Sequence, residues 1–170
     1  MARIDKIDRR TDVVFLVFSY AEAIEGVTKL QKLLFLIEQE TEFFQAYEND
    51  IAFEFAPYKM GPFSKHVYEE LEFLLSLDAI ETEPLPGADP NPTDSEFAEQ
   101  RFTITAKGEK IAAQLESQLE PEYCDELSDT VTTYNSLELQ DLLKYVYTEY
   151  PEYAADSEII DELEIEMAAE

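Results

Sequence analysis

The stretch YKMGPFSKHVYEELEFLL, residues 58–75, combines a chain break, a helix start and an amphipathic helix. Gly61 permits an unusual backbone angle, and Pro62 suits the entrance of a helix. Ser64 can cap that helix, and Phe63 can pack back onto its first turns as a hydrophobic staple. Four apolar residues then recur at helical spacing: Val67, Leu71, Leu74 and Leu75. The stretch therefore predicts a helix that begins at Ser64 and has one buried face.

The residues before this stretch predict two helices and one short strand. Apolar residues recur over 9–24 and predict a largely buried helix that ends at Gly26. Thr28 is then expected to cap a second helix that runs to about Glu40. The segment IAFEFA, residues 51–56, alternates and is rich in Phe, which predicts a short strand or extended segment.

The residues after it predict a β-hairpin and three more helices. Segments 79–83 and 100–104 are expected to pair as strands. Between them, residues 84–95 hold four prolines and a glycine, so they predict a loop. Thr105 is expected to cap a helix over 107–119. Two further helical patterns follow, over 122–133 and 136–150.

This order of elements predicts a mainly helical α+β fold of winged helix-turn-helix type, in which a β-hairpin wing follows the third helix. We expect residues 1–120 to form the winged-helix-like domain. Residues 121–153 would be a helical extension packed on it. Residues 154–170 would be an acidic tail, either a short helix or a frayed end.

The charge of the chain is extreme, with a formal net charge of −27 at pH 7. Acids occur in nearly every segment, which favours the acidic surface of a halophilic protein over a patch made for one basic partner. Of the 12 Lys and Arg residues, 11 lie within residues 1–110. The bases are therefore concentrated in the expected winged-helix part.

Three segments resemble the YwgA-like family, which is related to the Panacea antitoxin domain. They are KLQKLLFLIE at 29–38, FAPYKMGPFSKHVYEELEFLLSLDAIE at 55–81 and FTITAKGEKI at 102–111. The chain is similar to an acidic, haloarchaeal-type member, and the resemblance covers roughly residues 10–120. It implies a winged-helix-like fold and a non-enzymatic role, which in the Panacea relatives is toxin neutralisation or adaptation of proteins for proteolysis.

Enzyme chemistry finds little support in the sequence. His66 is the only histidine and Cys124 the only cysteine. Cys124 stands in PEYCDEL, where neighbouring carboxylates should raise the pKa of its thiol and disfavour the thiolate. No Gly-rich phosphate loop, H-E-x-x-H or G-x-S-x-G motif is present. We expect no catalytic residue, no cofactor and no metal site.

The helix start at Ser64 leaves two interpretations open. Its residues can serve the fold alone, or the helix N-terminus and nearby bases can bind an anion. We expect the partner surface to combine this start with the surrounding bases: Arg9, Arg10, Lys29, Lys32, Tyr58, Lys59, Gly61, Pro62, Phe63, Ser64, Lys65, His66 and Arg101. The partner would be a protein, such as a toxin or a regulatory complex. The alternative is a transcriptional regulator that binds a specific DNA sequence with the third helix and the wing at high salt.

Five tyrosines near the C-terminus predict either packing or an interface: Tyr134, Tyr145, Tyr147, Tyr150 and Tyr153. We favour packing for Tyr145 and leave the others open. An interface there could hold a homodimer together. No run of 18 apolar residues and no signal peptide is found, so we expect a cytoplasmic protein with no membrane partner.

Overall fold

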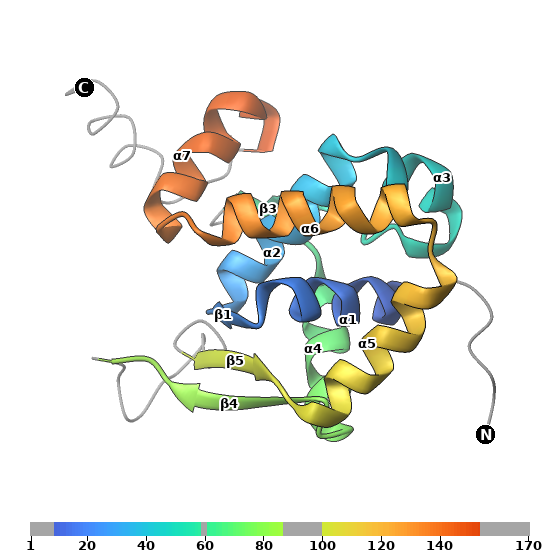
Figure 1. The fold of residues 1–170 in the computed structure, drawn as a ribbon. Helices are drawn as coiled ribbons and strands as arrows, with labels where there is room; N and C mark the ends of the chain where they lie inside the picture. The colour runs from blue at the N-terminus through green and yellow to red at the C-terminus, as the bar shows by residue number, and fades with distance from the viewer. Residues whose placement is uncertain (1–8, 59–60, 87–99, 154–170) are drawn as a thin grey trace.

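The computed structural model describes residues 9–58, 61–86 and 100–153, which are mainly helical with a small antiparallel sheet. Helix α1 (Arg10–Ala21) lies at the centre, between α4, α5 and α6 (Figure 1). Its six consecutive apolar residues from Val13 to Phe18 are all buried. A helix that is apolar on every side belongs in the interior, and α1 organises the main core in this way.

The first helix ends at Ala21, five residues before the predicted end at Gly26, and strand β1 (Ala23–Glu25) follows it. Glu22, with a φ of 65°, turns the chain out of the helix, and Ile24 then enters the sheet fully buried. Helix α2 (Val27–Glu40) starts after Gly26, whose φ is 92°. The predicted cap at Thr28 is therefore wrong, because the helix has already begun at Val27.

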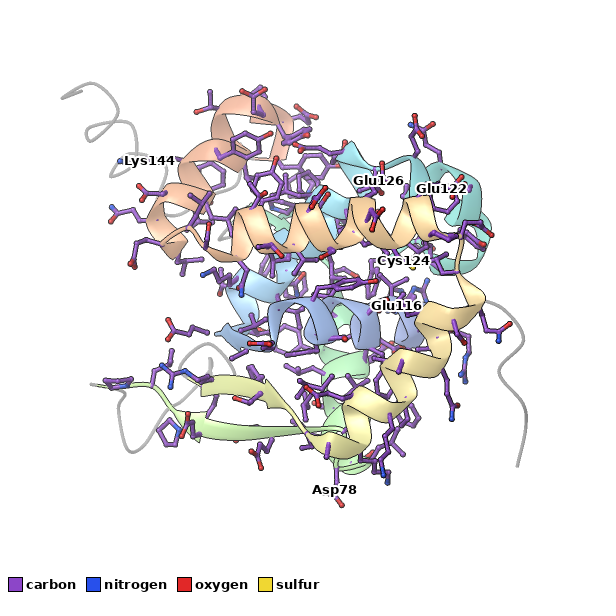
Figure 2. The ribbon with its side chains drawn as sticks, viewed as in Figure 1. Asp78, Glu116, Glu122, Cys124, Glu126 and Lys144 are labelled. Atoms are coloured by element: carbon purple, nitrogen blue, oxygen red, sulfur yellow. The ribbon has the colours of Figure 1, made fainter. Side chains whose placement is uncertain are left out.

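Helix α3 (Glu42–Ile51) was not predicted. A short strand or extended segment was predicted over 51–56, but Ile51 is helical, residues 52–55 are in neither helix nor strand, and only Ala56 belongs to a strand. Ile51 ends this helix, and the strand that follows is β2 (Ala56–Tyr58). The start of α3 is held from a distance, since the carboxylate of Glu126 accepts the main-chain N–H groups of Glu42 and Phe43, each at 2.9 Å. Figure 2 labels Glu126 on α6, the helix that passes beneath α3. This long-range cap explains why local pattern did not reveal the helix.

Strand β3 (Gly61–Phe63) pairs with β2, so Pro62 lies inside a two-stranded sheet, opposite Pro57, instead of only breaking the chain. Helix α4 (Lys65–Ser76) confirms the predicted start. The hydroxyl of Ser64 accepts the N–H of His66, and the ring of Phe63 lies 5.7 Å from that of Tyr68.

The predicted hairpin is confirmed as β4 (Ile80–Pro84) and β5 (Gln100–Ile104). Strand β1 pairs with the other side of β5, giving the sheet order β1-β5-β4. Helix α5 (Ala106–Gln118) begins at the predicted cap, where Thr105 accepts the N–H of Gly108 at 3.1 Å. A Cβ on Gly108 would lie 2.1 Å from the carbonyl oxygen of Ala79, so this position requires glycine.

The C-terminal helices are α6 (Pro121–Asn135) and α7 (Leu139–Glu149), followed by the 3-10 turn η2 (Pro151–Tyr153). Helix α6 packs on α1, and α7 packs on α2 (Figure 1). A second apolar cluster joins α7 to α2, and its buried members are Phe35, Leu36, Leu142, Leu143, Val146 and Tyr147. The predicted acidic tail, residues 154–170, lies outside the described residues. In the part of the chain that the structure describes, no helix has the length and apolarity needed to cross a bilayer.

Candidate functional site

Two of the three resembling segments contact each other directly, at a contact that we call the α2–β3 joint. It consists of Gln31 and Lys32 from α2 with Pro62 and Ser64 from the GPFS segment. The amide of Gln31 donates to the carbonyl of Ser64 and accepts its N–H, both at 3.0 Å. The ammonium of Lys32 donates to the carbonyl of Pro62, also at 3.0 Å. The spacing of KLQKLL and GPFS therefore fixes where the start of α4 sits on α2.

Ser64 and Gly61 serve this joint structurally. Ser64 is buried, and its hydroxyl donates to the carbonyl of Phe53 while capping α4. Gly61 has a φ of 90°, and a Cβ there would lie 2.6 Å from a ring carbon of Tyr147 on α7. Both residues are thus occupied by the fold, and the serine hydroxyl does not face solvent.

Lys32 is only 2% exposed. Burial alone lowers the pKa of its ammonium from 10.5 to about 7, because a charge in the interior loses its hydration. Among the described residues, no carboxylate pairs with it. Lys32 was predicted as part of a partner surface, and its burial places it in the interior.

One group of the predicted bases lies where α1 and α4 begin. Arg10 donates to the carbonyl of Ala52 at 2.6 Å, and Arg9 lies 3.4 Å from Asp12. His66 lies 3.0 Å from Glu69, and this hydrogen bond, together with the nearby charges of His66, Lys65 and Arg10, lowers the pKa of the Glu69 carboxyl. Lys65 is exposed, and Lys59 lies outside the described residues. This end of the molecule mixes both signs of charge.

Lys29 and Arg101 form a second group at the other end of α1, near β1. Lys29 is buried and donates to the carbonyl of Asn135 at 2.8 Å, and burial lowers the pKa of its ammonium. Arg101 bridges Glu25 at 2.7 Å and Glu83 at 3.1 Å, and these bonds raise the pKa of its guanidinium. Twelve residues of helix α1 separate the two groups, which is about 18 Å of axial rise.

An aromatic strip of Tyr58, Phe63 and Tyr68 lies near the joint; Tyr58 is exposed, and Phe63 and Tyr68 are partly buried. The ring of Phe63 lies 5.0 Å from that of Tyr58 and 5.7 Å from that of Tyr68. Tyr58 is 48% exposed. The strip runs from β2 across β3 onto α4, so it marks the outer face of the GPFS segment.

The C-terminal tyrosines mostly pack, as predicted for Tyr145. Three hydroxyls converge on the carboxylate of Glu40, which ends α2: those of Tyr134 at 2.5 Å, Tyr145 at 2.7 Å and Tyr150 at 2.6 Å. The ring of Tyr153 lies 4.7 Å from that of Phe35. These contacts fasten α6, α7 and η2 to α2, and sequence reasoning missed Glu40 because acids are common throughout the chain.

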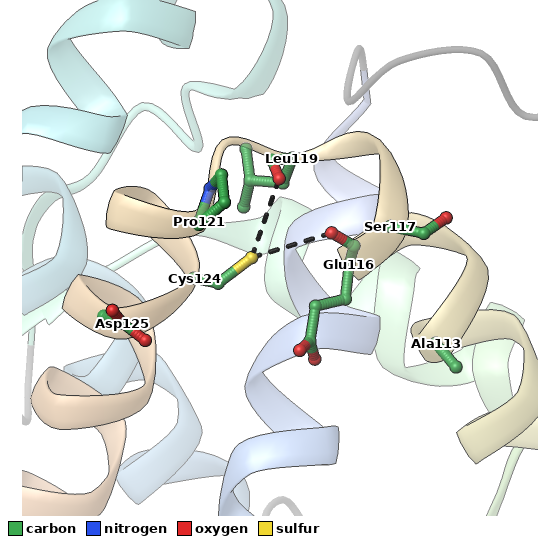
Figure 3. A pocket seen from close by; sticks show the side chains of 7 residues that line it. All are labelled: Ala113, Glu116, Ser117, Leu119, Pro121, Cys124 and Asp125. Carbon is green, nitrogen blue, oxygen red and sulfur yellow. Dashed lines mark hydrogen bonds between the residues drawn. The ribbon is translucent and has the colours of Figure 1, made fainter.

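Cys124 lines a cavity of about 540 Å³ between the end of α5 and the start of α6 (Figure 3). Its thiol lies 3.6 Å from the carbonyl oxygen of Glu116. Burial raises the pKa of this thiol, and the carboxylates of Glu116, Asp125 and Glu120 add to the effect. The predicted direction of the pKa shift is confirmed, although desolvation is its largest cause.

Among the described residues, no cluster of three or more His, Cys, Asp or Glu side chains is arranged to hold a metal ion. Comparison with known proteins gave no match: no family model fits the chain, and neither a curated protein nor a solved structure matches it. The resemblance to the YwgA-like family therefore stays a prediction.

Proposed function

We propose that the chain is a non-enzymatic, antitoxin-like regulatory module of winged-helix type, which acts in the cytoplasm by binding another protein. The element order supports the winged-helix part of this proposal. Helix α1 leads to β1, α2 and α4, and the β4–β5 hairpin follows α4 with the sheet order β1-β5-β4. Helix α3 and the β2–β3 hairpin would then be an insertion between the second and third helices of that fold.

The observation that carries the binding role is the aromatic strip. Tyr58 is the exposed member of this strip. Exposed aromatic side chains beside a rigid element are typical of protein interfaces, because their rings bury a large area at little entropic cost. The α2–β3 joint supplies the rigidity, since Gln31 and Lys32 fix the strand that carries Phe63. Lys65 at the edge of the strip adds an exposed positive charge, which suits a partner with acidic groups at the rim of the interface.

The distribution of the lysine and arginine residues favours a protein partner over DNA. A winged helix that binds duplex DNA needs basic side chains along the third helix and the wing. Here Lys29 and Lys32 are buried, and Arg101 in the wing is bridged to two carboxylates. The bases at the start of α1 and α4 lie at the opposite end of α1 from Arg101.

A photo-crosslinking experiment tests the proposal. A photoreactive phenylalanine replaces Tyr58 in one variant and Phe73 in another, and both proteins are exposed to native lysate at molar salt with and without nuclease. Phe73 is a matched control because it is an aromatic of similar exposure, 44%. It lies five residues beyond Tyr68 on α4, about 140° further around the helix.

We expect a discrete protein adduct at position 58, resistant to nuclease and absent at position 73. The purified partner should then lose binding to Tyr58→Ser and keep binding to Phe73→Ser. Adducts that are the same at both positions would contradict the proposal. Nuclease-sensitive adducts at position 58 would indicate DNA binding instead, and an adduct of twice the chain mass would indicate a homodimer through this surface.

A further inference from the structure

Side chains of α2 hold the β2–β3 hairpin along one edge of β3 (Figure 1). Pro57 and Pro62 are paired across the hairpin and neither has an N–H group, so the carbonyl of Pro62 points away from β2. That carbonyl accepts from Lys32, and the main chain of Ser64 bonds to the amide of Gln31. Two side chains of α2 thus take the place that a third strand would have.

The hairpin depends on its neighbours for its position. Each of its strands has three residues, and an isolated two-stranded hairpin is marginally stable in water. All three residues of β2 are exposed, so they add little apolar burial. The hairpin also contacts α7 and η2. Strand β3 carries Phe63, the middle member of the aromatic strip, so the α2–β3 joint helps to hold the strip in place.

Lys32 is the incompletely paired member of this joint. Its side chain is buried, and its ammonium would have three hydrogens, of which the carbonyl of Pro62 accepts one. Among the described residues, no second acceptor lies within hydrogen-bond distance. A buried charge with one neutral partner is costly, whereas a neutral amine in the same place is not. The geometry of the joint therefore suits Lys32 without its extra proton.

The elements around Lys32 bring no opposite charge to it. Burial is the only cause that lowers the pKa of its ammonium, to about 7, since neither a nearby charge nor a side-chain hydrogen bond contributes. Strand β3 has no titratable side chain. The elements packed against α2 and β3 carry titratable side chains that are cationic, phenolic or bonded elsewhere: Lys29, Glu38 and Glu40 on α2, Glu25 on β1, Lys65, His66 and Glu70 on α4, Tyr134 on α6 and Tyr147 on α7.

We propose that the α2–β3 joint is a pH-sensitive switch, in which protonation of Lys32 opens the contact between α2 and β3 and admits water to the ammonium. In the closed form Lys32 is neutral and β3 is held on α2. In the open form the ammonium is hydrated and Phe63 loses its fixed position. Opening becomes more favourable as pH falls from 10.5 to about 7, because the open form binds the proton more tightly, and levels off below pH 7. The effect on partner binding rests on the proposed function, whereas the switch itself does not.

Hydrogen exchange of single amides, in the full chain without any partner, tests the switch at molar KCl. The amide of Ser64 donates to Gln31 at 3.0 Å, so its protection factor reports the joint. The amide of Leu16, inside buried α1, reports unfolding of the main core. We expect Ser64 to be far less protected than Leu16, and about thirtyfold less protected at pH 7 than at pH 9. Since no partner is present, failure of the proposed function would not alter this result.

Two results of this measurement would overturn the proposal. Equal protection of Ser64 and Leu16 would mean that the joint opens only when the whole chain unfolds. A protection factor of Ser64 that did not change between pH 7 and 9 would mean that no proton is taken up on opening.

Two variants identify the titrating group. Lys32→Met keeps a long apolar side chain and cannot be charged, so Ser64 should be equally protected at pH 7 and pH 9. Lys65→Met, at an exposed position of α4, should keep the wild-type pH dependence. A pH dependence that persisted in Lys32→Met would also overturn the proposal, because another group would then operate the joint. If Lys32→Met does not fold, the comparison of Ser64 with Leu16 in the wild type still decides between local and global opening.

Discussion

Helix α2 carries two ionisable groups, Lys32 and Glu40, which differ in burial and in their hydrogen-bond partners. Lys32, near its middle, is a cation in the interior with one neutral carbonyl as partner. Glu40, at its end, is an exposed anion that accepts three tyrosine hydroxyls. Burial costs the charged form of Lys32 its hydration, whereas Glu40 keeps water and gains donors. The same helix is therefore attached to β3 through a buried lysine, whose neutral form burial favours, and to α6 and α7 through tyrosine hydroxyls that donate to the exposed carboxylate of Glu40.

The largest expected effect concerns salt, which separates surface charge from interior charge. With a net charge of −27, the chain repels itself in dilute buffer, and molar salt shortens the screening length to about 3 Å. We expect the far-ultraviolet circular dichroism of folded helix to be lost between molar and millimolar KCl. Sucrose at matched osmolality, without salt, is the control and should not restore it. A spectrum unchanged over this range would refute the halophilic interpretation.

The second effect concerns Lys32 and pH. Its pKa is about 7 in the folded chain and 10.5 as a free side chain, so the unfolded state binds the proton more tightly between these values. The free energy of unfolding should therefore rise with pH in this window. Below pH 7 the destabilisation by the buried, charged Lys32 is complete. Between pH 7 and 9, before tyrosines ionise, we expect Lys32 to contribute a rise of about 2 kcal/mol.

Lys32→Met should remove this pH slope, as measured by urea unfolding at molar KCl and pH 7, 8 and 9. The substitution also removes a donor from the carbonyl of Pro62, so the slopes and not the absolute stabilities are compared. Lys65→Met, at an exposed position on α4, is the control and should keep the wild-type slope. Parallel curves for Lys32→Met and the wild type would show that Lys32 is hydrated and charged in the folded protein.

Sequence pattern predicted the elements whose signals are local. Ser64 and Thr105 cap their helices as expected because a cap involves residues two or three positions apart. The β4–β5 hairpin was predicted because RFTIT, residues 101–105, alternates, and because the four prolines and the glycine of residues 84–95 indicate a loop before it. Helix α3 was missed because a distant carboxylate, Glu126, binds the N–H groups at its start. The start of α2 was missed because the residue before the helix is a glycine at positive φ.

The candidate surface was harder to predict than the fold. Lysine in a sequence suggests an exposed charge, and nothing local distinguishes Lys65, which is exposed, from Lys32, which is buried. The difference arises when β3 covers α2, an event between residues 30 positions apart. The Glu40 cluster is similar, since its three tyrosines follow it by 94 to 110 residues. Tertiary contacts therefore determine which of these residues are exposed and which come together, and the periodicity of the sequence does not predict those contacts.

The smallest expected effect concerns Glu40 and sharpens the contrast with Lys32. Burial and the hydrogen bonds to Glu40 raise the pKa of Tyr134 and Tyr150, because a phenolate there would lose hydration and face a carboxylate. Glu40→Gln keeps an acceptor and removes the charge. The alkaline absorbance titration of tyrosine near 295 nm should therefore shift to lower pH, while Glu109→Gln leaves it unchanged. Stability at pH 7 should fall by less than about 1 kcal/mol, because the carboxylate is exposed to solvent.

The sign of the pH dependence is opposite to that of Lys32. Because the folded tyrosines have raised pKa values, their stabilising contribution is complete below pH 10 and is lost as pH rises beyond it. The wild type should thus gain stability from pH 7 to 9 through Lys32 and lose it above pH 10 through the tyrosines. Glu40→Gln should change only the loss of stability above pH 10, and Lys32→Met should change only the gain between pH 7 and 9. A variant that altered stability in both pH ranges would mean that Lys32 and Glu40 are energetically coupled through the helix.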